Sequence, residues 1–390
     1  MKLPLYGSNK TRVLRMPLNY NDIKEVTIKG RYVTHKDVDP FLNNVAKDFT
    51  IQTEGLSVEE LAIKSIVLGK GELKILMWSQ MHGNESTTTK AVLDLINYLK
   101  SDSDLASSIL KDCTLKIVPI LNPDGAMAYT RVNANGVDLN RDAQERTQPE
   151  SVVLRRIYEE FKPNYCFNLH DQRTIFNVGN TPRPATVSFL APAHDPERSI
   201  SKTRGISMQL IVAMNEELQK FIPGQVGRYD DGFNSNCVGD TFQMLNIPTI
   251  LFESGHFPGD YDREVTRKYI FTAMLKAIEV ISKGTIDQYN RDSYFDIPDN
   301  NKLFFDVLIK NIHILEPKHE QGSSAAIQFV ETLVNGKIEF IGKLEEIGNL
   351  QGKFGHKTYN CLYAKDLKEL KNNPDLADLL RNTGIFFQKI

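Results

Sequence analysis

The sequence predicts an α/β fold in which helices cover both faces of one sheet. From residue 70 to residue 283, short apolar segments that suit strands alternate with amphipathic segments that suit helices, an order typical of this fold class. Polar residues follow the ends of several predicted strands. A turn-rich stretch near residue 300 then leads into a small, mainly β C-terminal appendage.

The elements of the main part can be placed one after another. Residues 73–78 form the first strand, and Ser86-Thr87-Thr88 supplies N-cap candidates for the next helix. That helix carries apolar residues at helical spacing: Ala91, Val92, Leu95, Ile96 and Leu99. The remaining elements, in chain order, are a strand at 115–121, a helix at 152–161, strands at 165–169 and 186–190, a helix at 206–221, a strand at 249–252 and a helix at 265–281.

The C-terminal part has a different pattern. Asp299-Asn300-Asn301 marks a boundary, and Asn335-Gly336 between two apolar segments predicts a hairpin. A helical segment at 367–380 is interrupted near Pro374. We therefore expect a lead-in over residues 1–50, a main domain over 51–290 and an appendage over 291–390.

Composition excludes several classes of partner. The 390 residues carry 47 basic and 49 acidic side chains, a net charge of −2, so neither nucleic acid nor a membrane surface is expected as a partner. The four cysteines form no C-x-x-C pair, no apolar run approaches a spanning helix, and the first residues resemble no signal peptide. These features predict a cytoplasmic location.

His82 and Glu85 follow the first predicted strand in the segment Gln80–Glu85. Histidine and glutamate three residues apart in a turn can both face one divalent cation, and zinc accepts both donor types. A solvated polar turn is the alternative. His170 also follows a strand end, and its alternative is a structural histidine. Because ligand sites form at the carboxyl ends of strands in open α/β sheets, the three residues are candidates to bind one metal ion together.

Other polar residues fit roles around such an ion. Asp138 is the candidate partner for the second nitrogen of His82, and Arg131 could stabilise a developing oxyanion. Asn140 and Arg141 form a pair suited to a carboxylate. Each of them could instead be an ordinary loop residue.

Glu253 ends an apolar strand, where a carboxylate is costly unless it has a partner or a role. We expect a general base here, with helix capping as the alternative. His256 is expected to line the rim of the site.

Taken together and in this order, the motifs resemble those of the carboxypeptidase A-like family of zinc metallopeptidases (peptidase family M14), over roughly residues 50–285. The resemblance implies a mixed, largely parallel sheet, zinc bound by His82, Glu85 and His170, and a terminal carboxylate held by Asn140 and Arg141. It further implies that Arg131 polarises the scissile carbonyl and that Glu253 is the base. A metallocarboxypeptidase acting on peptides with a free C-terminal carboxylate is thus expected.

Other features are less fixed by the motifs. The family often uses a mobile tyrosine, for which Tyr229 is the candidate. The pocket for the terminal side chain could hold Asp240, which favours a basic residue, or an apolar wall of Val238, Thr241 and Met244.

Of two alternatives to the peptidase function, the first stays open. An N-acyl amino-acid deacylase of the aspartoacylase or succinylglutamate desuccinylase type has similar motifs, and Asp171 after His170 resembles those enzymes. A non-catalytic binding module is disfavoured because every expected catalytic position is filled.

Overall fold

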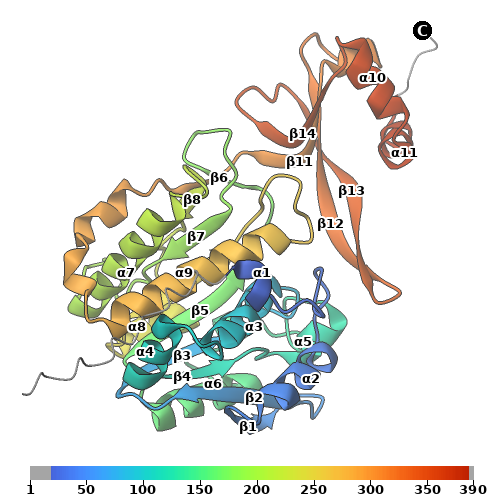
Figure 1. The fold of residues 1–390 in the computed structure, drawn as a ribbon. Coiled ribbons are helices and arrows are strands. Elements are labelled where there is room, and N and C mark those ends of the chain that lie inside the picture. The colour runs from blue at the N-terminus through green and yellow to red at the C-terminus, as the bar shows by residue number, and fades with distance from the viewer. Residues whose placement is uncertain (1–18, 386–390) are drawn as a thin grey trace, which may run out of the picture.

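The computed structural model describes residues 19–385, which form an α/β part with a second, smaller sheet beside it (Figure 1). The larger sheet has eight strands in the order β1-β2-β4-β3-β5-β9-β7-β8. Their bounds are β1 (Thr50–Leu56), β2 (Ala62–Gly69), β3 (Leu73–Trp78), β4 (Cys113–Val118), β5 (Tyr165–Asp171), β7 (Val187–Leu190), β8 (Val226–Arg228) and β9 (Thr249–Ser254).

The sheet is mixed, and its centre is parallel. Strands β4, β3, β5 and β9 run parallel to one another, whereas β2 and β7 join this group in antiparallel pairing on either side. The carboxyl ends of the four central strands therefore meet at one edge. This arrangement confirms the predicted fold class.

Helices cover both faces of the sheet (Figure 1). The larger apolar core lies under four of them: α3 (Thr87–Leu99), α4 (Asp104–Asp112), α7 (Lys202–Leu218) and α9 (Glu264–Ser282). A second core lies under two others: α6 (Pro149–Phe161) and α8 (Val238–Met244). Strand β3 serves both, because Ile75 and Met77 pack into the first core and Leu76 and Trp78 into the second.

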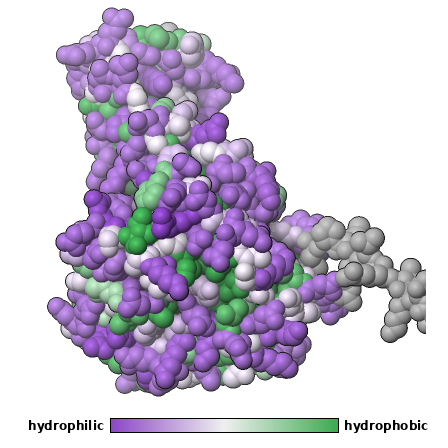
Figure 2. Space-filling model, turned by 90° about the vertical axis from the view of Figure 1, so that its left-hand side faces the viewer, coloured by the Kyte–Doolittle hydropathy of each residue, from purple (hydrophilic) through white to green (hydrophobic). Residues whose placement is uncertain are grey.

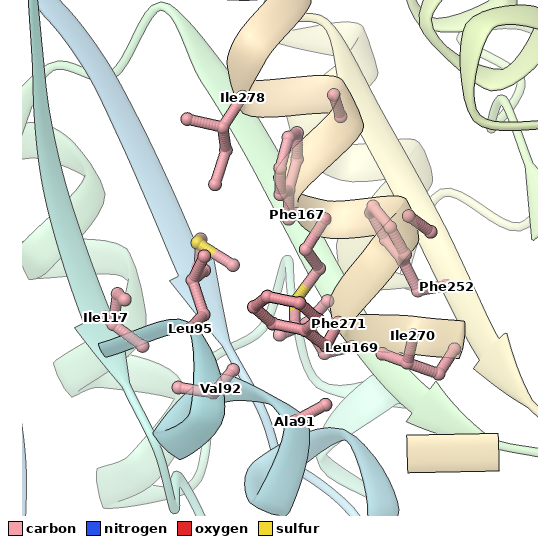
Figure 3. Packing of buried hydrophobic residues seen from close by; sticks show 14 of the residues in the cluster. Ala91, Val92, Leu95, Ile117, Phe167, Leu169, Phe252, Ile270, Phe271 and Ile278 are labelled. Carbon is pink, nitrogen blue, oxygen red and sulfur yellow. The ribbon is translucent and has the colours of Figure 1, made fainter. Parts of the chain in front are cut away.

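Figure 3 shows the centre of the larger core, where side chains of α3 and α9 meet those of the strands. The rings of Phe167 on β5 and Phe252 on β9 lie 5.1 Å apart between centroids. Successive residues of a strand point to opposite faces. His170, after the core residue Leu169, and Glu253, after Phe252, are therefore both directed to the other face.

Short elements connect and flank this framework. They are α1 (Tyr20–Ile23), α2 (His35–Val45), α5 (Pro123–Ala128), η1 (Leu139–Arg141), β6 (Phe176–Val178), η2 (Ile286–Gln288), η3 (Arg291–Asp296) and β10 (Asn300–Lys302). Strand β10 pairs with β6, so the chain returns to the main part before it enters the second sheet. Within residues 19–385, no helix combines the length and apolar character needed to cross a membrane.

The second sheet has four strands in the order β13-β12-β11-β14. Its elements are β11 (Phe304–Lys310), η4 (Ile312–Ile314), β12 (Ser324–Val334), β13 (Lys337–Gly348), β14 (Phe354–Asn360), α10 (Ala364–Lys371) and α11 (Pro374–Asn382). Asn335 and Gly336 have φ values of 49° and 76°, as a tight hairpin turn requires, and β12 and β13 form the predicted hairpin. The domain boundaries at residues 51 and 291 stay predictions.

Candidate metal centre and active site

The loop between β3 and α3 carries the first two candidate ligands, His82 and Glu85. Its shape is held by Gln80, whose side-chain nitrogen donates to Gly83 O at 2.8 Å and to Val33 O at 2.9 Å. A Cβ on Gly83 would lie 1.9 Å from the carbonyl carbon of Gly125. Only glycine therefore fits at this position without a shift of the backbone, which seats the loop directly on α5.

His82, Glu85 and His170 converge on one point. His82 Nδ1 lies 2.9 Å from Glu85 Oε1, His170 Nδ1 lies 2.9 Å from Glu85 Oε2, and the two Nδ1 atoms are 3.1 Å apart. The three side chains are buried, and their candidate ligand atoms lie within 4.8 Å of one another. Two imidazole nitrogens that face each other beside a carboxylate fit a shared cation, and the donor set is one that zinc accepts.

Asp138 lies behind His82. Its Oδ1 contacts His82 Nε2 at 2.9 Å, and its Oδ2 accepts from Arg131 Nε at 3.0 Å. Burial alone would raise the pKa of Asp138, but the contact with His82 and the Arg131 charge hold this pKa well below its ordinary value. A charged Asp138 fixes the ring of His82 so that Nδ1 faces the other two candidate ligands.

Three cationic or amide side chains surround the centre. Arg131 is half exposed and reaches Glu85 Oε1 at 3.4 Å. Asn140 accepts from Val238 N at 3.0 Å, which places it beside the start of α8. Arg141 donates to Asn140 O and Cys237 Sγ, and among the described residues no carboxylate pairs with it. Its charge is therefore available to an anionic ligand.

Glu253 lies in register with His170 on the neighbouring strand. It is buried, and its Oε2 has no hydrogen-bond partner among residues 19–385. Burial and the negative charges of Glu85 and Asp171 raise its pKa well above the ordinary value. An unpartnered buried carboxyl group is costly, and such groups gather at functional sites.

One cavity of about 450 Å³ brings these residues together, and Tyr229 also lines it. Tyr229 follows β8, and its ring packs against Phe176. Burial, together with the charge of Glu253, raises the pKa of the Tyr229 hydroxyl. The cavity is lined by the residues predicted for metal and substrate: His82, Glu85, Arg131, Asn140, Arg141, His170, Tyr229 and Glu253.

Of the two walls expected for a substrate side chain, the cavity contains the acidic residue but not the predicted apolar residues. Asp240 lines the cavity, and its burial raises its pKa to about 6. Val238, Thr241 and Met244 do not line it. Its apolar surface instead comes from Ile175, Phe176, Leu190, Pro192 and Leu251.

Asp171 and His256 both have contacts that support the fold. Asp171 accepts from Thr87 N at the start of α3 and from Arg31, so its side chain anchors the helix that follows Glu85. His256, expected at the rim, is instead buried, and its ring lies 4.1 Å from that of His356 between centroids. The second sheet covers His256, which the sequence could not indicate.

Sequence reasoning missed two cations at the cavity, Arg173 and Lys302. Arg173 stands three residues after His170, and its closeness in sequence to a candidate ligand could have indicated that it lies at the cavity. Lys302 reaches the cavity through the pairing of β10 with β6, which joins segments about 125 residues apart and leaves no local pattern.

Comparison with known proteins agrees with the predicted resemblance. Residues 41–174 match the family described as zinc carboxypeptidase. The chain is 41% identical to carboxypeptidase SOL1 of Arabidopsis thaliana over 111 residues, and 26% identical to carboxypeptidase 2 of Trichophyton rubrum over 112 residues. These matches cover 25% and 28% of this chain, and only 22% and 21% of the two relatives.

Solved structures agree in fold. A metallo-carboxypeptidase from Burkholderia cenocepacia aligns with a TM-score of 0.53 at 19% identity, over 65% of this chain and 70% of that one. Carboxypeptidase A from Helicoverpa armigera aligns with a TM-score of 0.51 at 17% identity, over 64% and 73%.

Proposed function

We propose that this relative of the zinc carboxypeptidases is a zinc-dependent metallocarboxypeptidase that hydrolyses the C-terminal residue from peptides. The observation that carries the proposal is that one cavity brings together His82, Glu85 and His170, the buried Glu253, and Arg141, which pairs with no carboxylate of residues 19–385. Hydrolysis needs the first two features, and recognition of a chain terminus needs the third.

Zinc would be held by His82, Glu85 and His170. When bound, zinc supplies a Lewis acid and makes water acidic enough to act as a nucleophile near neutral pH. Burial raises the pKa of the nearby Glu253, and the charge of a bound zinc ion would oppose this shift and favour the carboxylate form.

The remaining roles fall to the side chains around the centre. Arg141 and Asn140 bind the terminal carboxylate of the substrate, as a guanidinium and an amide can do together. Arg131 faces Glu85 and stabilises negative charge on the carbonyl oxygen as it develops. Glu253 takes a proton from water at its free Oε2 and passes it to the leaving amine. Tyr229 closes the substrate side of the cavity.

The test compares three substrates with the same terminal residue: a free-acid peptide, its C-terminal amide and an N-acetyl amino acid. We expect hydrolysis of the free acid and little of the amide, because only the free acid offers Arg141 a carboxylate. Arg141→Ala should lower kcat/KM for the free acid at least about 30-fold, roughly 2 kcal/mol, the lower end for truncating one partner of a charge pair.

Arg146→Ala is the matched control, because Arg146 lies close by in the same loop region, its guanidinium donates to Gln144 O, and it does not line the cavity. Equal cleavage of the free acid and the amide by the unaltered protein would refute an exopeptidase. Release of acetate from the N-acetyl amino acid, with neither peptide cleaved, would support the deacylase alternative instead.

A further inference from the structure

A second cavity of about 330 Å³ adjoins the first. Both are lined by Glu85, Arg131 and the segment 171–173, so they meet at the candidate metal centre. The second cavity contains neither Asn140 nor Arg141. If the terminal carboxylate lies in the first cavity, as the proposed function requires, the rest of the peptide extends into the second.

The far wall of this second cavity is the C-terminal sheet. Residues 328–331 of β12 line it, together with Asp306 of β11 and Phe340 of β13. None of these residues belongs to the part of the chain that resembles the peptidases. The appended sheet therefore supplies one side of the space beside the candidate catalytic residues.

Strand β12 is fixed to the main part at both ends of this short stretch. At one end, Glu331 forms a two-pronged ion pair with the buried Arg31, with contacts of 3.2 and 3.3 Å, and accepts from the Tyr129 hydroxyl. At the other end, Gln328 Nε2 donates to Thr174 Oγ1 at 2.6 Å. The strand thus crosses the cavity from the side of Arg31 to the side of Thr174.

The neighbouring strands hold β12 in this position. Asp306 accepts from the Tyr261 hydroxyl at 2.9 Å, and the ring of Tyr261 packs against Phe329 and Phe340 at 5.4 and 5.2 Å between centroids. His356 Nε2 on β14 contacts Thr174 O at 2.8 Å. Strand β12 is therefore held both by its own contacts with the main part and by those of the neighbouring strands, and it forms a fixed wall.

We propose that the C-terminal sheet closes the acyl side of the active site and so limits the substrate to short peptides, with room for only a few residues before the scissile bond. This inference rests on the proposed function. The volume is near the lower end of the roughly 300–1,000 Å³ typical of small-molecule sites. Longer chains are excluded because their next residues meet β12, a form of selection by steric conflict.

The test is a length series of N-acetyl peptides with one, two, four and eight alanines before one terminal residue. We expect kcat/KM to fall at least about tenfold between two and four alanines, through both kcat and KM, because steric conflict weakens productive binding. Constant or rising kcat/KM across the series, with the free acids still cleaved, overturns this inference alone. Failure to cleave any member overturns the proposed function as well.

A widened wall supplies the second readout. Phe340→Ala removes a ring from the cavity, so kcat/KM for the four-alanine peptide should rise at least about threefold while that for the shortest peptide changes less than about twofold. Ile341→Ala is the matched control, because Ile341 is the next residue on β13, is half exposed and does not line this cavity. Unchanged length preference in Phe340→Ala, in a protein with unaltered Tm, contradicts the proposal.

Discussion

The proposed role of Glu253 as general base depends on its burial and on its position beside His170. Glu253 is buried in register with His170 and carries an oxygen without a partner among the described residues. Glu253→Gln keeps the shape and removes the basic group. We expect kcat to fall on the order of 10²-fold or more, the usual range for loss of a general base, while about one zinc ion per chain is retained in elemental analysis.

His170→Ala is the informative companion to that substitution. It removes a candidate ligand, so metal and activity should be lost together. Normal turnover in Glu253→Gln, or full zinc occupancy in His170→Ala, would show that the roles of these two residues have been misassigned.

At this scale, the sequence indicated the residues whose signal is local. His82 and Glu85 stand three positions apart after a strand, and the Asn140-Arg141 pair is contiguous. Arg31 and Glu331 were not indicated, because 300 positions separate them and their pairing depends on the placement of the second sheet. Local patterns report chemistry within one loop, whereas long-range ion pairs are visible only after folding.

The loop between β3 and α3 carries two of the three candidate metal ligands, His82 and Glu85. Gly83→Ala would place a methyl group 1.9 Å from the Gly125 carbonyl carbon, so the loop must move away from α5 and separate His82 from Glu85. We expect zinc affinity to fall about 10- to 100-fold, as for other changes to the surroundings of metal ligands, measured by competition with a chelator.

Gly205→Ala on α7 is a suitable comparison. Its new methyl group would come closest to the side chain of Arg291, at 3.2 Å, which can move aside, and would lie at ordinary contact distance from Ile200, at 3.9 Å. Unchanged zinc affinity in Gly83→Ala would mean that the loop is not held by this contact.

Helices and strands could be predicted where the spacing of apolar residues, or a turn motif, was clear. Strand β3 was placed with its observed bounds, and Asn335-Gly336 indicated the hairpin of β12 and β13. The predicted strand at 115–121 instead ends at Val118, since the apolar residues Ile120 and Leu121 are buried without continuing the strand. A run of apolar residues indicates that the segment is buried. It forms a strand only where a neighbouring strand offers backbone hydrogen bonds.

For the whole molecule, Glu264 links parts that lie far apart in the chain. It pairs with Lys90 of α3 at 2.6 Å and with Lys24 at 2.7 Å. Burial alone would raise its pKa, but Lys90 and Lys24 lower this pKa from 4.5 to about 2. Lys90 is itself buried, which lowers its pKa to about 8, so it stays charged throughout the acid range and only Glu264 titrates there.

A lowered pKa in the folded state stabilises the fold above pH 4.5, and this contribution is lost as the pH falls toward 2. Glu264→Gln should therefore lower Tm by about 2–4 °C at pH 7, and the difference from the unaltered protein should shrink between pH 4.5 and pH 2. Thermal unfolding followed by circular dichroism measures both proteins across this range.

Glu216→Gln, an exposed change on α7 for which the described residues hold no ion pair, should leave Tm unchanged at each pH. A Tm difference for Glu264→Gln that is constant from pH 7 to pH 2 would exclude the ion pair as its source.

The ion pair between Arg31 and Glu331 has a consequence for how the chain matures. Arg31 is buried, and it also contacts Asp171, the residue directly after His170. A ribosome releases Arg31 and His170 long before Glu331 emerges. Until then, Arg31 lacks its two-pronged partner Glu331, and in a finished fold the removal of one partner of a buried ion pair costs about 3–5 kcal/mol. We therefore expect the surroundings of the candidate metal centre to be completed only after the C-terminal sheet has been synthesised, so that the proposed activity and the proposed wall arise together.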